Sequence, residues 1–229
     1  MIPSVTMADD LLERLVRVYG AARDEARAAS MAAYMRDKFA FLGFPQPTQR
    51  ALARTVLAGL PAPVEDDLRA VALGCWALPE REYQYFACDW LRTQQAVPGS
   101  GFLATARTLI TTKSWWDTVD PLATRVVGNL VRRHGELVAD MDAWSADGDL
   151  WLVRTAILHQ LNYGADTDTE RLFGYCLRQA GHTDFFVRKA IGWALRQYAR
   201  TDPDAVRAFL AGNRQRLSPL SVREASKHL

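Results

Sequence analysis

The sequence contains little cysteine and little histidine, and this limits the chemistry open to it. Three cysteines and four histidines occur among 229 residues. Cys75, Cys88 and Cys176 are odd in number and widely separated, which argues against a disulfide framework and against a CxxC metal site. The histidines are scattered, with no HExxH motif and no Cys/His pair at ligand spacing. We therefore expect reduced thiols in the core, no metal ion and no cofactor.

Long apolar runs are missing as well. No stretch of about 18 apolar residues is present, and the first residues lack the basic and apolar regions of a signal peptide. We expect a cytoplasmic protein that does not associate with membranes. With 49% hydrophobic and 24% charged residues, the composition is that of a globular protein, and we expect one domain over residues 1–229. Nothing resembles a coiled coil or a dedicated dimer helix, so we expect a monomer.

Alternating strand patterns are also lacking, whereas apolar residues recur at helical spacing along the chain. The clearest stripes cover residues 122–131, 150–161 and 186–198. The breaks between stripes are short and carry helix-start signals. These signals are Asp202-Pro203, Ser218-Pro219 and the capping box formed by Thr167 and Glu170. The sequence therefore predicts an all-α protein.

A short segment recurs in the second half of the chain. Residues 153–157 (Val-Arg-Thr-Ala-Ile) return at 187–191 (Val-Arg-Lys-Ala-Ile), a shift of 34 residues. This period is typical of helical-hairpin repeats, which stack into a solenoid with a concave face. Arg154 and Arg188 occupy the same place in the two copies, either as a ladder bridging repeats or as a row of phosphate contacts. The least structured connection, residues 93–101, separates an N-terminal half from the repeats.

Charge is distributed unevenly although the net charge is only +2. Residues 181–229 hold nine Lys and Arg against four Asp and Glu, whereas the rest of the chain holds 19 against 22. Such a surplus suits a face that binds a polyanion, and it is also typical of ordinary solvated surface.

One segment crowds two indoles and two carboxylates into seven residues, Ser114-Trp115-Trp116-Asp117-Thr118-Val119-Asp120. A carboxylate beside indole faces suits a cationic ligand or a transition state that develops positive charge, because both groups attract cations. The alternative is a packed Trp pair beside a helix start.

Six ordered blocks, covering nearly the whole chain, resemble the AlkD family of DNA alkylation repair proteins, which are HEAT-like-repeat alkylpurine DNA glycosylases. The blocks are Tyr34-Met35 with Phe39-Ala40-Phe41-Leu42-Gly43; Leu78-Pro79-Glu80-Arg81-Glu82; Lys113 to Asp120; Trp151-Leu152-Val153-Arg154; Lys189-Ala190-Ile191-Gly192-Trp193; and Leu217 to Ser221 with Arg223-Glu224-Ala225. The resemblance implies a HEAT-like solenoid with a basic concave face.

The resemblance also implies an activity and its residues. It implies hydrolysis of the N-glycosidic bond of cationic N3- and N7-alkylated purines in duplex DNA. Trp116, Asp120 and Trp193 match the family's catalytic and lesion-facing positions. Arg154 matches an arginine that holds the DNA backbone, and Tyr34 matches a DNA-proximal tyrosine. No lysine is nominated for a Schiff base, so we expect a monofunctional enzyme without lyase activity.

The residues leave alternatives to these assignments. Asp120 precedes Pro121 and can be the N-cap of a helix over residues 121–133. Trp193 lies on an apolar helix face and can be core, as we expect for the five remaining tryptophans. Further candidates for phosphate contacts are Lys113, Arg188, Lys189 and Arg196. The alternative function is a non-catalytic helical-repeat module that binds DNA or protein.

Overall fold

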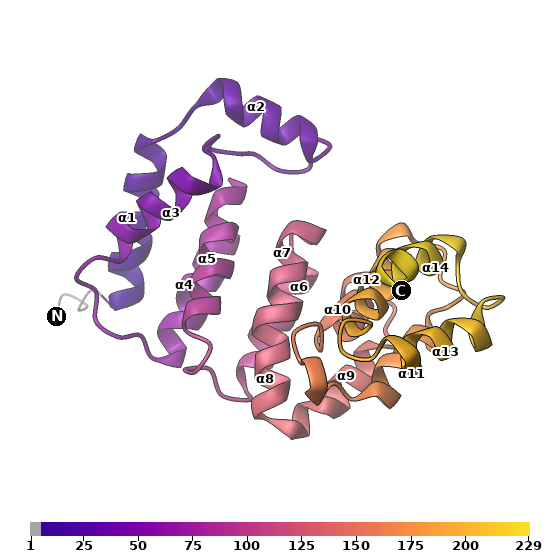
Figure 1. Cartoon of the computed structure of the whole chain (residues 1–229). Helices are drawn as coiled ribbons and strands as arrows, with labels where there is room; N and C mark the ends of the chain where they lie inside the picture. Colours follow the sequence, from indigo (N-terminus) through magenta and orange to yellow (C-terminus); the bar gives the residue numbers. More distant parts are fainter. Residues whose placement is uncertain (1–5) are drawn as a thin grey trace. The chain divides into compact units, whose positions relative to one another are not determined.

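The computed structural model describes residues 6–229, except for the side chain of His228, and these residues form helices (Figure 1). Within this range the all-α prediction is confirmed, since the one β feature is an isolated bridge between Ala40 and Glu80. The chain divides into two compact units, Met1–Thr105 and Ala106–Leu229. The boundary falls in α6 (Phe102–Thr111), shortly after the predicted connection at residues 93–101. That residues 1–229 act as one domain stays a prediction. No helix in the described part of the chain is long and apolar enough to span a membrane.

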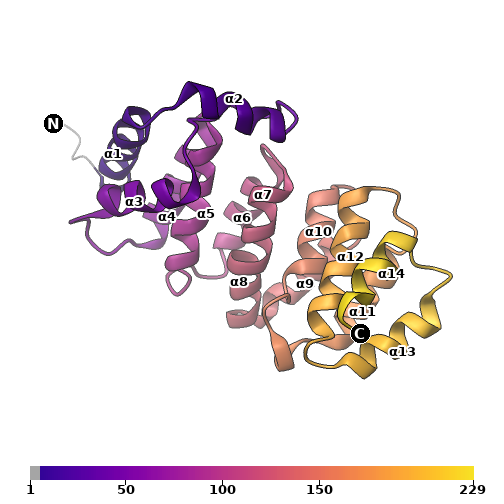
Figure 2. The same ribbon diagram turned by 45° about the horizontal axis from the view of Figure 1, so that its top comes forward.

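In the described part of the first unit, from residue 6 onward, five helices precede α6. They are α1 (Met7–Ala21), α2 (Glu25–Tyr34), α3 (Gln46–Leu57), α4 (Glu65–Ala77) and α5 (Arg81–Thr93). Helix α1 packs against α3 and α4 (Figure 2). The buried ring of Tyr19 forms the centre of this core, with ring centroids 5.1 Å from Phe44 and 6.0 Å from Phe86. Aromatic packing of this kind stabilises the unit.

Two of the family-like blocks meet inside the first unit. The buried carboxylate of Glu82 accepts hydrogen bonds from the backbone N–H groups of Leu42 and Gly43, both at 2.8 Å. Gly43 has φ +94°, and a Cβ there would lie 2.1 Å from the carbonyl oxygen of Asp24. Only glycine fits this close approach. These blocks therefore have a structural role in the fold.

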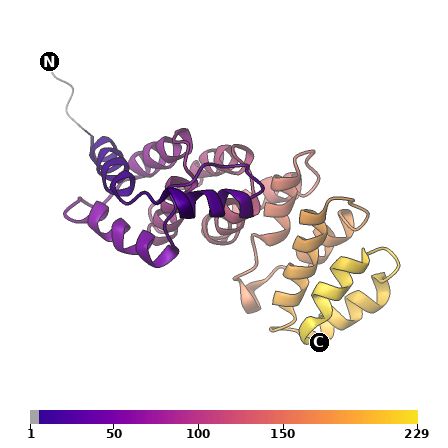
Figure 3. The same cartoon turned by 90° about the horizontal axis from the view of Figure 1, so that it is seen from above.

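The second unit holds the end of α6, followed by helices and short helical segments. They are α7 (Trp116–Pro121), η1 (Leu122–Val127), α8 (Gly128–Arg133), η2 (Gly135–Leu137), α9 (Val138–Trp144), α10 (Leu150–Leu158), η3 (Gly164–Asp166), α11 (Thr169–Arg178), α12 (Phe185–Tyr198), α13 (Pro203–Asn213), α14 (Pro219–Ala225) and η4 (Ser226–His228). Helices α10, α12 and α14 lie side by side, with α12 in contact with both neighbours (Figures 2 and 3). The two copies of the 34-residue repeat thus begin adjacent helices.

Most of the predicted helix starts are confirmed. Asp202 accepts a hydrogen bond from Ala205 N at 2.9 Å as the N-cap of α13, and Ser218 is the N-cap of α14. The prediction of a capping box at Thr167 is wrong by one residue, because Asp168 is the N-cap of α11. The hydroxyl of Thr167 donates to the carbonyl of Gly164 at 2.7 Å.

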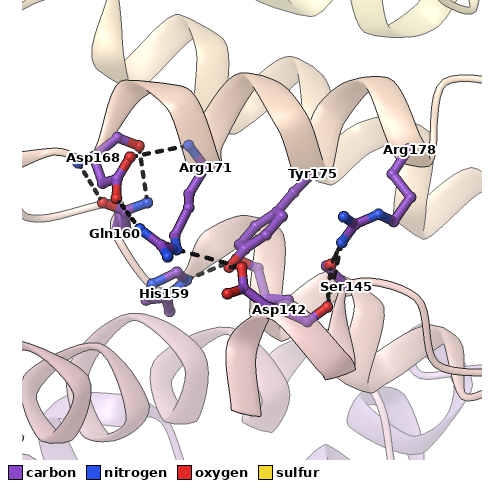
Figure 4. A network of polar contacts seen from close by, with 9 residues as sticks. Asp142, Ser145, His159, Gln160, Asp168, Arg171, Tyr175 and Arg178 are labelled. Carbon is purple, nitrogen blue, oxygen red and sulfur yellow. Dashed lines mark hydrogen bonds and ion pairs between the residues drawn. The ribbon is translucent and has the colours of Figure 1, made fainter. Parts of the chain in front are cut away.

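A polar network ties α9 and the turn that follows α10 to α11 (Figure 4). The Tyr175 hydroxyl donates to Asp142 at 2.6 Å, and Asp168 N donates to the Gln160 side chain at 2.7 Å. His159 is fully enclosed beside this network, with Nδ1 2.7 Å from the carbonyl oxygen of Ala156. Burial lowers the pKa of His159 to about 4, because the charged imidazolium would lose its hydration. His159 is therefore a neutral core residue.

The cysteines also behave as predicted. Cys75, Cys88 and Cys176 are all buried. Desolvation raises the pKa of the Cys176 thiol to about 12, so this sulfur stays protonated and unreactive.

Candidate functional site

Asp120 lies inside a helix, so the N-cap alternative is wrong. The helix begins after Trp115, and α7 continues through Pro121 into the π-helical segment η1. Proline has no N–H to donate to the carbonyl four residues earlier, which normally interrupts an α-helix. Here the wider π-helical turn follows directly, and Gly128 N–H bonds to the carbonyl of Ala123, five residues back. Such π-helical turns occur often at functional sites.

Trp116 and Asp120 are four residues apart and therefore share one face of α7. That face borders a pocket of about 300 Å³. The pocket is lined by Trp116, Asp120, Arg154, Phe185, Phe186, Lys189, Trp193 and Arg196. All three predicted catalytic residues thus lie around one cavity, together with three of the predicted DNA contacts.

Arg154 of α10 holds the Asp120 carboxylate with two parallel hydrogen bonds. Nε donates to Oδ1 at 2.7 Å, and Nη2 donates to Oδ2 at 2.8 Å. Nη1 donates to the backbone carbonyl of Phe186 at 2.5 Å. Arg154 is only 4% exposed, so its guanidinium links α7, α10 and α12 from within the unit. Bidentate pairs of this kind fix the direction of the carboxylate as well as its position.

Opposing effects act on the pKa of Asp120. Burial raises this pKa, while the hydrogen bonds and the charge of Arg154 lower it. The net shift is upward from the ordinary value. Without Arg154 the carboxylate would lose its main stabilising partner, and its pKa would rise further.

The neighbouring indoles Trp115 and Trp116 lie in different surroundings. Trp115 is buried against Phe186 and Trp151, with ring centroids 4.8 and 5.9 Å away. Trp116 is half-buried at the pocket, as is Trp193 from α12. The prediction that the other five tryptophans are core residues is confirmed. These buried residues are Trp76, Trp90, Trp115, Trp144 and Trp151.

Five of the residues that line the pocket come from α12, namely Phe185, Phe186, Lys189, Trp193 and Arg196. Lys189, Trp193 and Arg196 follow the i, i+4, i+7 spacing that places side chains on the same side of a helix. Lys189 and Arg196 both contact the carboxylate of Glu224, at 2.9 and 3.0 Å. The site therefore has an acidic wall on α7 and a basic wall on α12.

The remaining predicted contacts are not part of this pocket. Arg188 donates from Nε to the carbonyl of His182 at 2.7 Å, within its own repeat. Arg154 thus bridges neighbouring helices, as the ladder alternative predicted, whereas the Arg188 side chain bonds within its own repeat. Tyr34 is the last residue of α2 in the first unit and is 77% exposed. Lys113 precedes α7 and has φ +51°, an uncommon conformation for a residue other than glycine.

Three residues of this region were not predicted from the sequence. Phe185 and Phe186 line the pocket, and Phe185 is 55% exposed. The sequence signal was present, because aromatic residues precede both copies of the repeat. Glu224 occurs in one of the family-like blocks, but its contact with α12 depends on tertiary packing.

The chemistry available to the pocket follows from its groups. Among the described residues that line it, Asp120 is the one carboxylate. Asp120 can stabilise a positive charge, and the indoles of Trp116 and Trp193 can contribute their electron-rich faces. No group of three or more His, Cys, Asp or Glu side chains that could hold a metal ion occurs in the described part of the chain.

Comparison with known proteins identifies the family. No curated protein matches the chain. Among solved structures, a predicted DNA alkylation repair enzyme from Enterococcus faecalis is similar, with 32% sequence identity and a TM-score of 0.82. The match covers 90% of this chain and 96% of that one. A sequence model for the family described as DNA alkylation repair enzyme matches residues 16–229. The chain therefore belongs to the DNA alkylation repair enzyme family.

Proposed function

We propose that this protein is a monofunctional DNA glycosylase that releases cationic N3- and N7-alkylated purines from duplex DNA. The observation that carries the proposal is the position of Asp120, which Arg154 orients toward a pocket bordered by Trp116 and Trp193. An oriented carboxylate between aromatic faces suits a reaction that generates positive charge on a sugar.

The proposed reaction needs few groups. The bond between C1′ and the purine nitrogen breaks, and its electron pair leaves with the base, which becomes neutral. The sugar develops oxocarbenium character, and Asp120 stabilises this charge. Each Asp120 oxygen accepts one bond from Arg154, which leaves a lone pair for an attacking water. The water adds to C1′ and its proton passes to the solvent, so that a neutral base and an abasic site remain.

The substrate class follows from the lack of a second acid among the described residues of the pocket. A neutral purine is a poor leaving group and needs protonation by a general acid. Asp120 cannot be both that acid and the anion that stabilises the sugar. A base alkylated at N3 or N7 already carries positive charge, so it can leave without protonation.

We further propose that Arg154, Lys189 and Arg196 contact the DNA backbone beside the pocket. Arg154 has five N–H hydrogens and uses three of them on Asp120 and Phe186. Lys189 and Arg196 are more exposed and offer their charge at the opposite wall. Tyr34, Lys113 and Arg188 are proposed as further DNA contacts that do not line the pocket.

The alternative is a non-catalytic module that binds DNA, in which the Asp120–Arg154 pair would only support the helices. A DNA-binding groove has no use for a carboxylate, because it repels phosphate. Incubation with duplex DNA that carries N7-methylguanine, followed by measurement of free base, separates the two. Release of the base supports the glycosylase, and tight binding without release supports the module.

A further inference from the structure

Glu224 of α14 collects three cations around one carboxylate. Lys189 Nζ lies 2.9 Å from Oε1, Arg196 Nη1 lies 3.0 Å from Oε2, and Lys227 Nζ lies 2.9 Å from both oxygens. Glu224 itself is only 4% exposed. A buried carboxylate is costly unless it is paired, and here three cations satisfy it.

The packing of α14 on α12 sets this arrangement. A Cβ on Gly192 would lie 2.4 Å from Glu224 Cβ and 2.9 Å from the carbonyl oxygen of Ser221. A larger residue at position 192 would therefore push the two helices apart. The Ser221 hydroxyl donates to the carbonyl of Arg188 at 2.8 Å and adds a polar tie. Gly192 thus lets Glu224 come close to the side chains on either side of Trp193.

The cluster is electrostatically unbalanced. The three cations surround one anion, so the cluster has a net charge of +2. Hydrogen bonds from Lys189 and Lys227 lower the pKa of Glu224 to about 2, and the carboxylate stays ionised at neutral pH. The side chains of Lys189 and Arg196 are 37% and 25% exposed, whereas that of Glu224 is 6% exposed. The excess positive charge therefore faces outward.

Two cations at this pocket conflict with its proposed substrate. Positive charge beside a cationic base or an oxocarbenium-like sugar raises the free energy of both. A backbone phosphate next to the damaged nucleotide resolves the conflict, because it supplies the anion that Lys189 and Arg196 need. Their unused N–H hydrogens can donate to its oxygens. The position of the cations then has to be fixed, so that they reach the phosphate and stay away from the base.

We propose that Glu224 is a positioning residue that holds Lys189 and Arg196 as a two-cation grip for one DNA backbone phosphate beside the alkylated nucleotide. This inference rests on the proposed function for the location of the phosphate. It assigns the C-terminal helix α14 a role in DNA binding through α12, without direct contact between Glu224 and DNA.

The test uses duplexes that carry one tetrahydrofuran abasic-site analogue, which sets the binding register and holds no base to excise. One phosphate at a time around this analogue is replaced by an uncharged methylphosphonate. With the wild-type protein, one position should weaken binding on the order of tenfold, as expected when a charge-assisted contact is lost. The penalty at that position should disappear in the double variant Lys189→Met/Arg196→Met. In Glu224→Gln it should fall to about threefold or less, since the cations remain but are no longer held in place.

Asp204→Asn is the matched control. It also removes one negative charge from the second unit, from an exposed pair with Arg207. This variant should keep the full penalty. Thermal unfolding is measured for all variants to detect a loss of stability. Such a loss alone lowers the amount of folded protein, but it leaves unchanged the ratio of the affinities for the duplex with unmodified phosphates and the methylphosphonate duplex. If Glu224→Gln does not fold, Glu224→Asp takes its place, because it keeps the negative charge but draws the carboxylate back from Lys189 and Arg196; it should lower the penalty as well.

Three results would overturn the inference. They are the absence of any sensitive phosphate in the wild type, a penalty that persists in Lys189→Met/Arg196→Met, and a full penalty in Glu224→Gln. Because the abasic-site analogue holds no base, the result does not depend on excision. If the predicted penalties occur and N7-methylguanine is not released, the phosphate grip stands and the glycosylase proposal fails.

Discussion

Arg154 and Asp120 form a bidentate pair, with Nε to Oδ1 at 2.7 Å and Nη2 to Oδ2 at 2.8 Å, although they are 34 residues apart in the sequence. The pair joins α7 to α10 and directs the carboxylate along the pocket wall. The same pair therefore holds two helices together and orients the carboxylate that we propose acts in catalysis.

Asp120→Asn should slow release of N7-methylguanine on the order of 100-fold or more, because an amide cannot stabilise the developing cation. Affinity for duplex DNA should stay similar or increase, since a negative charge is removed from the pocket. Single-turnover excision and equilibrium binding measure the two effects. Asp168→Asn is the control, because it also removes a carboxylate paired with an arginine, outside the pocket. Equal rates in the Asp120 variant and the wild type would contradict the catalytic role.

Arg154→Met should shift the pH dependence of excision. Asp120 must be ionised, so activity falls as the pH drops through the Asp120 pKa. Burial already raises this pKa, and Arg154 opposes the rise. Loss of Arg154 should therefore move the acid limb to higher pH. Excision rates over a pH series measure the shift, and an unchanged acid limb would show that Arg154 does not stabilise the Asp120 charge.

Trp193→Ala should reduce excision by roughly 30-fold, which corresponds to the loss of about 2 kcal/mol from a desolvated cation–π contact. Trp144→Ala is the control, because Trp144 is a buried core residue of the same unit. The control should lower thermal stability more than it lowers excision per folded molecule. If Trp193→Ala also lowers thermal stability more than it lowers excision per folded molecule, Trp193 is a packing residue.

His159 should make the protein sensitive to mild acid. Its folded-state pKa of about 4 lies below the ordinary value of 6.5, so the unfolded chain binds the proton first as the pH falls. Neutral His159 makes its full contribution to the free energy of unfolding above pH 6.5, and this contribution is lost between pH 6.5 and 4. The loss amounts to roughly 3 kcal/mol in the free energy of unfolding. Denaturant unfolding of the wild type and His159→Gln measures it, and identical pH dependence in both would contradict the assignment.

The sequence predicted the features that depend on neighbouring residues. Asp202 and Ser218 were recognisable as N-caps because the capping residue and the proline are adjacent. Helical spacing predicted a helix over residues 186–198, where the structure has α12. The resemblance to a known family named Trp116, Asp120 and Trp193 together before the pocket was seen.

The features it failed to predict depend on packing. Asp120 looked like an N-cap because Pro121 usually starts a helix, whereas here a π-helical turn accommodates the proline inside one. The contact of Arg196 with Glu224 spans 28 residues and requires α14 to dock on α12. Spacing along the chain carries no signal for such a contact.

We propose that the pocket releases a base because the base is already charged. The most direct measurement compares release of N7-methylguanine and of the neutral base hypoxanthine, each placed at the same position of one duplex and assayed with an excess of the protein. We predict rapid release of N7-methylguanine and negligible release of hypoxanthine, because the described pocket residues include no acid besides Asp120. Comparable release of both bases would show that a general acid takes part and would contradict this account.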